Sequence, residues 1–130
     1  MAGRWANASG ANRTVTIAIS YGGTTLWQDT SANLGNGLAC GWTIATDLVA
    51  NGSATAQSLT GSIRLGSTGA TTVGQNGNLA GTAASAIGAA TLVGIAGTVN
   101  SAVAQTLTVS VTFNGTGITW TKYHHTLELL

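Results

Sequence analysis

Charged side chains are scarce in this chain of 130 residues, where they make up 5% of the sequence, against roughly 25% in an average soluble domain. General acids, general bases and ligands for hard metal ions are drawn mainly from these residue types. We therefore predict that the protein is not an enzyme and needs no cofactor. The remaining polar residues are mostly Thr, Ser and Asn, which gives a neutral surface suited to contact with further copies or with a partner protein.

Several other features are absent as well. Cys40 is the single cysteine, so no disulfide can form within the chain. The net charge is +1, and the few basic residues are scattered, so no footprint for nucleic acid or anionic lipid is indicated. No apolar run approaches the roughly 20 residues of a membrane-spanning helix. We expect neither a nucleic-acid partner nor a membrane partner.

What is present is a strand-forming pattern. Proline is absent, glycine occurs 19 times, and Thr and Val recur between Gly-rich turns, which is typical of many short β-strands. Alternation of apolar and polar residues predicts two strands clearly, over residues 13–20 and 105–114. The apolar faces of these strands, predicted to lie in the core, are Val15, Ile17 and Ile19 in the first and Leu107, Val109, Val111 and Phe113 in the second.

Further strands are predicted over residues 24–30, 37–50, 54–65, 91–99 and 118–130. Within the second of these, Trp42 and Ile44 share one face and are predicted core residues. Asn51-Gly52 predicts a type I′ hairpin turn. Residues 66–81 are interpreted as a long loop with room for one short strand, and the alanine content of residues 82–90 indicates a short helix.

About eight short strands of this spacing favour an all-β fold, a jelly-roll β-sandwich of antiparallel strands. Residues 1–9 are predicted to be an N-terminal arm, and residues 10–130 to be the single jelly-roll domain.

Candidate catalytic and metal-binding residues are few. His124 and His125 are adjacent, so on a strand their side chains point to opposite faces and cannot hold one metal ion together. The sequence has no G-x-S-x-G motif. The only acidic residues are Asp29, Asp47 and Glu128. These observations predict neither a metal site nor a catalytic site.

The tryptophans are the most informative large side chains. Trp27 and Trp120 lie among threonines, which favours exposed or interface positions. Trp5 follows Arg4 in the predicted arm, and an aromatic side chain beside arginine is common at contact hot spots. We therefore take these four residues as candidate contacts with a partner protein or with another subunit. Tryptophans exposed in a row could instead stack on sugar rings, as in a carbohydrate-binding module.

Four segments carry a resemblance to a known family: residues 10–16 (Gly-Ala-Asn-Arg-Thr-Val-Thr), 21–26, 103–109 and the terminal Leu-Glu-Leu-Leu at 127–130. From about residue 10 to its end, the chain resembles phage virion proteins that are small, trimeric jelly-roll domains, similar in topology to tumour necrosis factor. Such proteins serve as capsid cement (decoration) proteins or as heads of tail and head fibres. Family members usually have an additional strand or arm before the segment that matches 10–16.

The resemblance implies a homotrimer on the surface of a phage capsid, bound to the major capsid protein. The alternative it leaves open is a receptor- or glycan-binding head of a phage fibre. Exposure of Trp27 and Trp120 separates the two, because burial between subunits favours cement and a solvent-facing platform favours binding.

Overall fold

A computed structural model describes residues 1–31, 33–66 and 88–127 of the chain. These residues form eight β-strands. The strands are β1 (Ala2–Asn7), β2 (Val15–Tyr21), β3 (Thr24–Thr30), β4 (Ala39–Ser53), β5 (Ala56–Leu65), β6 (Gly88–Gly97), β7 (Leu107–Phe113) and β8 (Ile118–His124). Within the described ranges, no helix is long and apolar enough to cross a membrane.

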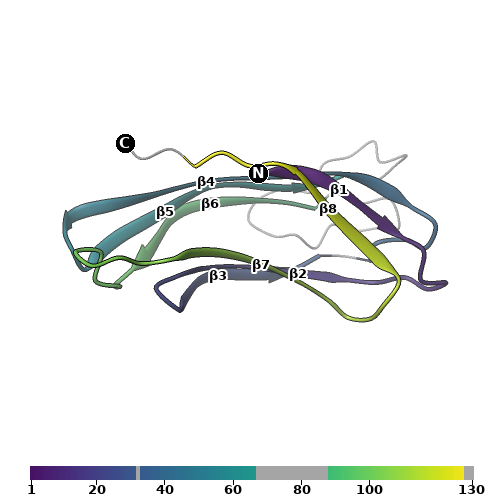
Figure 1. Cartoon of the computed structure of the whole chain (residues 1–130), viewed down its shortest axis with the longest axis horizontal. Coiled ribbons are helices and arrows are strands. Elements are labelled where there is room, and N and C mark those ends of the chain that lie inside the picture. Colours follow the sequence, from purple (N-terminus) through teal and green to yellow (C-terminus); the bar gives the residue numbers. More distant parts are fainter. Residues whose placement is uncertain (32, 67–87, 128–130) are drawn as a thin grey trace.

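The strands form two antiparallel sheets that face each other as two layers (Figure 1). The larger sheet has the order β6-β5-β4-β1-β8, and the smaller sheet has the order β3-β2-β7. The predicted all-β sandwich of antiparallel strands is confirmed. The jelly-roll topology is not confirmed by this strand order and stays a prediction, since β2 and β3, and likewise β4, β5 and β6, are neighbours both in sequence and in space.

The core lies between the two sheets, because alternate side chains of each strand point to the same face. Val15, Ile17 and Ile19 of β2 are all 0% exposed. On the larger sheet, the inward side chains include Trp42 and Ile44 of β4, both buried. The buried apolar residues are Trp5, Val15, Ile17, Ile19, Leu34, Trp42, Ile44, Leu59, Ile63, Leu65, Ala90 and Leu92.

The residues predicted to form an N-terminal arm are instead strand β1, which lies between β4 and β8 in the larger sheet. Trp5 is 1% exposed, and its indole N–H donates to the Gly66 carbonyl over 2.9 Å. The side-chain amide of Asn7, also buried, donates to the carbonyls of Ala11 and Leu34 over 2.9 and 2.8 Å. Gly, Ala and Asn favour strands weakly, so only pairing on both sides makes this segment a strand.

Two boundaries also differ from the prediction. The Asn51-Gly52 pair is not a hairpin turn: β4 continues through it to Ser53, and the turn follows at residues 54–55. The positive φ of Gly52, 76°, accompanies a register shift in β4 against β5. The last strand ends at His124 rather than at the chain terminus, of which residues 128–130 lie outside the described part.

The predicted loop over 66–81 and helix over 82–90 fall almost entirely on residues 67–87, which lie outside the described residues. Residues 88–90, at the end of the predicted helix, belong to β6.

Candidate interaction surface

None of the four tryptophans is exposed. Trp5 and Trp42 are 1% and 3% exposed. Trp27 and Trp120 are partly buried and pack against the core of their own subunit. A row of exposed indole rings is therefore not present on this molecule.

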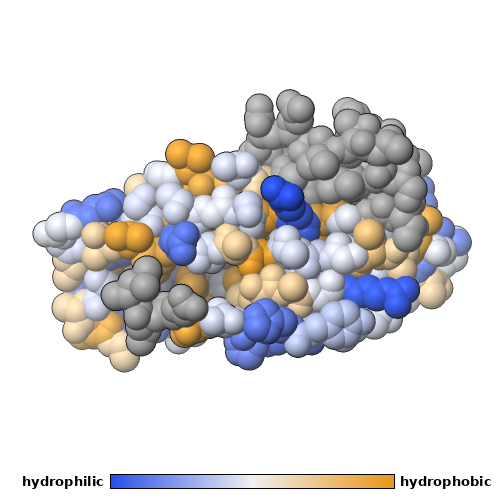
Figure 2. Space-filling view, turned by 90° about the horizontal axis from the view of Figure 1, so that it is seen from above, coloured by the Kyte–Doolittle hydropathy of each residue, from blue (hydrophilic) through white to orange (hydrophobic). Residues whose placement is uncertain are grey.

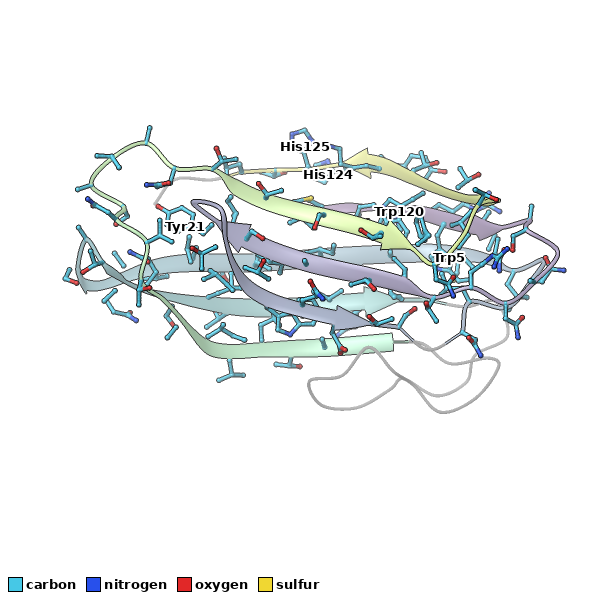
Figure 3. The ribbon with its side chains drawn as sticks, turned by 90° about the horizontal axis from the view of Figure 1, so that it is seen from below. Trp5, Tyr21, Trp120, His124 and His125 are labelled. Atoms are coloured by element: carbon cyan, nitrogen blue, oxygen red, sulfur yellow. The ribbon has the colours of Figure 1, made fainter. Side chains whose placement is uncertain are left out.

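Trp42, Trp120 and Phe113 form an aromatic cluster that joins the two sheets. The rings of Trp42 and Trp120 are stacked, with centroids 4.8 Å apart, and Phe113 packs against Trp120 at 5.9 Å with tilted planes. Figure 3 shows Trp120 near Trp5, its register partner on β1. Because Trp42 is buried and Trp120 is only partly buried, the cluster runs from the core to one long side of the sandwich.

That long side, where the edge strands β7 and β8 lie, is less covered than the centre of the molecule. We call it the β7–β8 flank. Its apolar side chains point inward but are only partly buried, whereas those of β2 are 0% exposed. They are Leu107, Val109, Val111 and Phe113 of β7 and Ile118 and Trp120 of β8.

The outer face of the larger sheet carries isolated charges among small residues. Arg4 on β1 is exposed and lies between Gly41 and Thr121 in the register of the sheet. Arg64, also exposed, lies opposite Thr43 on the same face. In Figure 2, which views this face, strongly hydrophilic residues are separate spots among pale and hydrophobic ones.

Arg4 and Trp5 point to opposite faces of the larger sheet, because neighbouring residues of a strand alternate. The structure therefore does not bring them together as a contact pair: Arg4 is on the surface and Trp5 is in the core. Arg64 was not a sequence candidate. Only the register of β4 against β5 places Arg64 on the same face as Arg4, and no sequence motif near Arg64 indicates that position.

Within residues 1–31, 33–66 and 88–127, the titratable side chains do not converge on a site. His124 and His125 are both exposed at the end of β8 (Figure 3), and the Nε2 atom of His124 lies 3.0 Å from the Thr126 hydroxyl. Asp29 and Asp47 belong to different sheets, on β3 and β4. Among the residues that the structure describes, no group of three or more His, Cys, Asp or Glu side chains is placed to hold a metal ion.

Comparison with protein-family models, with curated proteins and with solved structures finds no match to this chain.

Proposed function

We propose that this protein is a structural component of a phage particle: a homotrimeric cement (decoration) protein that binds the major capsid protein on the surface of the head. The observation that carries the proposal is a two-layer β scaffold whose outward residues are mostly small and carry few charges, with an incompletely covered apolar flank. The resemblance of residues 10–16, 21–26 and 103–109 to phage virion proteins supports the same function.

A cement protein stabilises a shell by bridging neighbouring subunits, and no chemical step is needed for this. Its contacts are broad, and shape complementarity with apolar packing dominates them. Since few charges are available to be screened, binding should depend weakly on salt. Closed symmetry lets every copy cover part of its neighbour, which suits a chain with so few charges on its surface.

The exposed side of β1 is the proposed capsid contact, through Arg4 on the outer face of the larger sheet. On the opposite face of β1, the Trp5 side chain packs in the core and so fixes the strand that carries Arg4. Deleting residues 1–9 would remove a central strand of the larger sheet, so single substitutions test the contact and truncation does not.

A second candidate function is a receptor- or glycan-binding fibre head. A glycan site usually offers an exposed aromatic ring on which a sugar ring can stack. The tryptophans offer none, but Tyr123 on β8 is 70% exposed and is followed by His124 and His125. This single ring is the observation that keeps the alternative.

Light scattering coupled to size exclusion tests the trimer, for which we expect a mass that is a whole multiple of three times 12.9 kDa. A monodisperse monomer at micromolar concentration would contradict the trimer.

Heating the parent phage particles with and without the protein tests the cement function. We expect DNA release at a higher temperature with the protein bound, at low and at high salt alike.

Arg4→Ala should lower occupancy on the shell, while Arg64→Ala, two strands away on the same face, should leave it unchanged. Equal heat stability of bare and decorated particles would overturn the cement function, and loss of host-cell binding in Tyr123→Ala would favour the fibre head.

A further inference from the structure

Among the strands that the structure describes, four are edge strands, β6 and β8 in the larger sheet and β3 and β7 in the smaller one. An edge strand presents unpaired N–H and C=O groups that can pair with a strand from another chain. Proteins block such pairing with bulges, with charged side chains or with proline. The four edges of this protein differ in these features.

Three of the edges have such protection. The registers of β3, β6 and β8 against their neighbours are each interrupted by a shift. In addition, β3 carries Asp29 opposite the buried Ile17, β6 carries Gly94 with a positive φ of 60°, and β8 carries the exposed Lys122. Each of these strands is a poor template for a further strand.

β7 has none of these features. It pairs with β2 in unbroken register, from Leu107 opposite Tyr21 to Phe113 opposite Val15. It contains no charged residue, and the whole chain contains no proline. Its outward side chains are exposed Thr and Ser, and its inward ones are the partly buried residues of the β7–β8 flank. Among the described strands, β7 is the one unprotected edge.

The hydrogen bonds to β2 show which backbone groups of β7 face the open side. The N–H of Gly22 donates to Thr106 O over 3.0 Å, and the N–H of Asn114 donates to Thr14 O over 3.3 Å. Residues that bond to a given neighbour alternate along an antiparallel strand. Even-numbered residues of β7 therefore bond to β2, and the odd-numbered ones point their N–H and C=O groups to the open side.

We propose that β7 pairs with the β7 strand of a second copy of this chain, antiparallel, across a twofold axis at Ser110. Leu107 then lies opposite the partner's Phe113, and Val109 lies opposite the partner's Val111. Both pairs join residues whose backbone groups face the open side. Each pair exchanges two hydrogen bonds and is repeated by the twofold axis, which gives roughly eight hydrogen bonds. The two smaller sheets become one continuous sheet in the order β3-β2-β7-β7-β2-β3.

A second copy fits this edge because an antiparallel strand is complementary to itself about a twofold axis. The axis at Ser110 uses the full length of β7 and keeps every inward side chain on the inward face. The partly buried apolar residues of each copy then cover those of the other, and no charge of β7 opposes them. A second β7 strand places its own row of N–H and C=O groups opposite the whole open edge, in matching register.

This contact goes beyond the proposed trimer and does not depend on it. A twofold contact cannot lie inside a threefold ring, so it would connect one trimer to the next. When the twofold axes cross the threefold axis, two trimers close into an assembly of six copies.

Ser110→Lys tests the contact. Ser110 is exposed, and in the pair its side chain lies directly opposite its own copy, so two lysines would repel each other. Gln28→Lys is the matched control, because Ser110, Ala18 and Gln28 form one row across the smaller sheet and Gln28 lies on the protected edge β3. In sedimentation velocity we expect Ser110→Lys to halve the mass of the wild-type assembly and Gln28→Lys to leave it unchanged.

Charge reversal makes the test specific. Ser110→Glu alone should also fail to associate, and an equal mixture of Ser110→Lys and Ser110→Glu should recover the wild-type mass. Ser110→Cys should form a disulfide-linked dimer under mild oxidation, because the Cα atoms of such a pair lie about 4.5 Å apart. Gln28→Cys, with the same native Cys40, should not.

The possible results separate this contact from the trimer. A wild-type trimer whose mass is the same in Ser110→Lys, with no cross-link in Ser110→Cys, would overturn the twofold contact and leave the trimer in place. A wild-type dimer that Ser110→Lys converts to a monomer would support the contact and contradict the trimer. A fall from six copies to three would support both. Circular dichroism of each variant verifies that it is folded.

Discussion

β2 and β7 are neighbouring strands of the smaller sheet, paired residue for residue, yet they differ in burial. Both alternate apolar residues with small ones, and in both the apolar residues point inward. Val15, Ile17 and Ile19 of β2 are 0% exposed, whereas the inward residues of β7 are only partly buried. β2 has a strand on each side, and β7 has one on one side only.

The difference shows that one sequence pattern can serve two purposes. In the central strand, the apolar residues contribute stability to the single chain. At the edge, similar residues keep part of their surface available to a second copy, and the backbone beside them has unpaired groups. Substitutions at matched positions of the two strands can therefore test whether β7 is covered in the assembled protein.

The largest effect is expected from a buried charge. Ile17→Asp should abolish soluble folded protein, because an unpaired buried carboxylate costs several kcal/mol or more, out of a typical total stability of about 5–15 kcal/mol. Val111→Asp, directly opposite on β7, should fold with a lower Tm, because its carboxylate can reach water at the edge. Soluble yield and thermal melts by circular dichroism measure both, with the outward Thr112→Asp as control. Equal loss at both positions would mean that β7 is as covered as β2.

A smaller effect is expected from removing methyl groups. Val15→Ala on β2 should lower the free energy of unfolding by about 2 kcal/mol, since a buried methylene contributes roughly 0.8 kcal/mol and a cavity adds to the loss. Val109→Ala on β7, whose side chain is partly buried, should cost about 1 kcal/mol. Urea unfolding of the dilute protein measures the two values. If the values become equal only at high protein concentration, self-association is what covers Val109.

The smallest effect concerns the outward face. The Thr16 and Thr30 hydroxyls lie 2.8 Å apart and share a hydrogen bond between β2 and β3. Thr16→Ala should cost about 0.5 kcal/mol, as expected for a solvent-exposed hydrogen bond, and Thr112→Ala on β7 should cost close to none. The Thr16→Ala, Thr30→Ala double variant should be no less stable than Thr16→Ala alone. Additive losses would show that the hydroxyl pair contributes nothing as a pair.

Much of the fold could be predicted from alternation alone. The strand over residues 24–30 was predicted with the bounds that the structure gives it, and the strands around Ile17 and Val109 with ends shifted by one or two residues. Alternation also identified the inward face of β4, with Trp42 and Ile44. It works because side chains of a strand project to opposite faces with a period of two, whatever the strand pairs with.

The candidate contact residues could be predicted far less well. Arg4 and Trp5 were grouped because they are adjacent in sequence, but a strand separates neighbours onto opposite faces. Trp120 was judged from the threonines beside it, whereas its stacking on Trp42 brings together β8 and β4, strands far apart in the chain. The residue types alone do not indicate that Arg4 and Trp5 lie on opposite faces, or that Trp120 stacks on Trp42.

Composition and a period of two are local properties, so they suffice to predict the fold class, the alternating faces and the scarcity of charge. Only the fold shows that residues 2–7 are an interior strand, that β2 is interior while β7 is an edge, and that β7 alone among the described edges lacks both a charge and a bulge. Those properties depend on which strands become neighbours, and pairing between segments as distant as β1 and β8 is set by the packing of the whole chain.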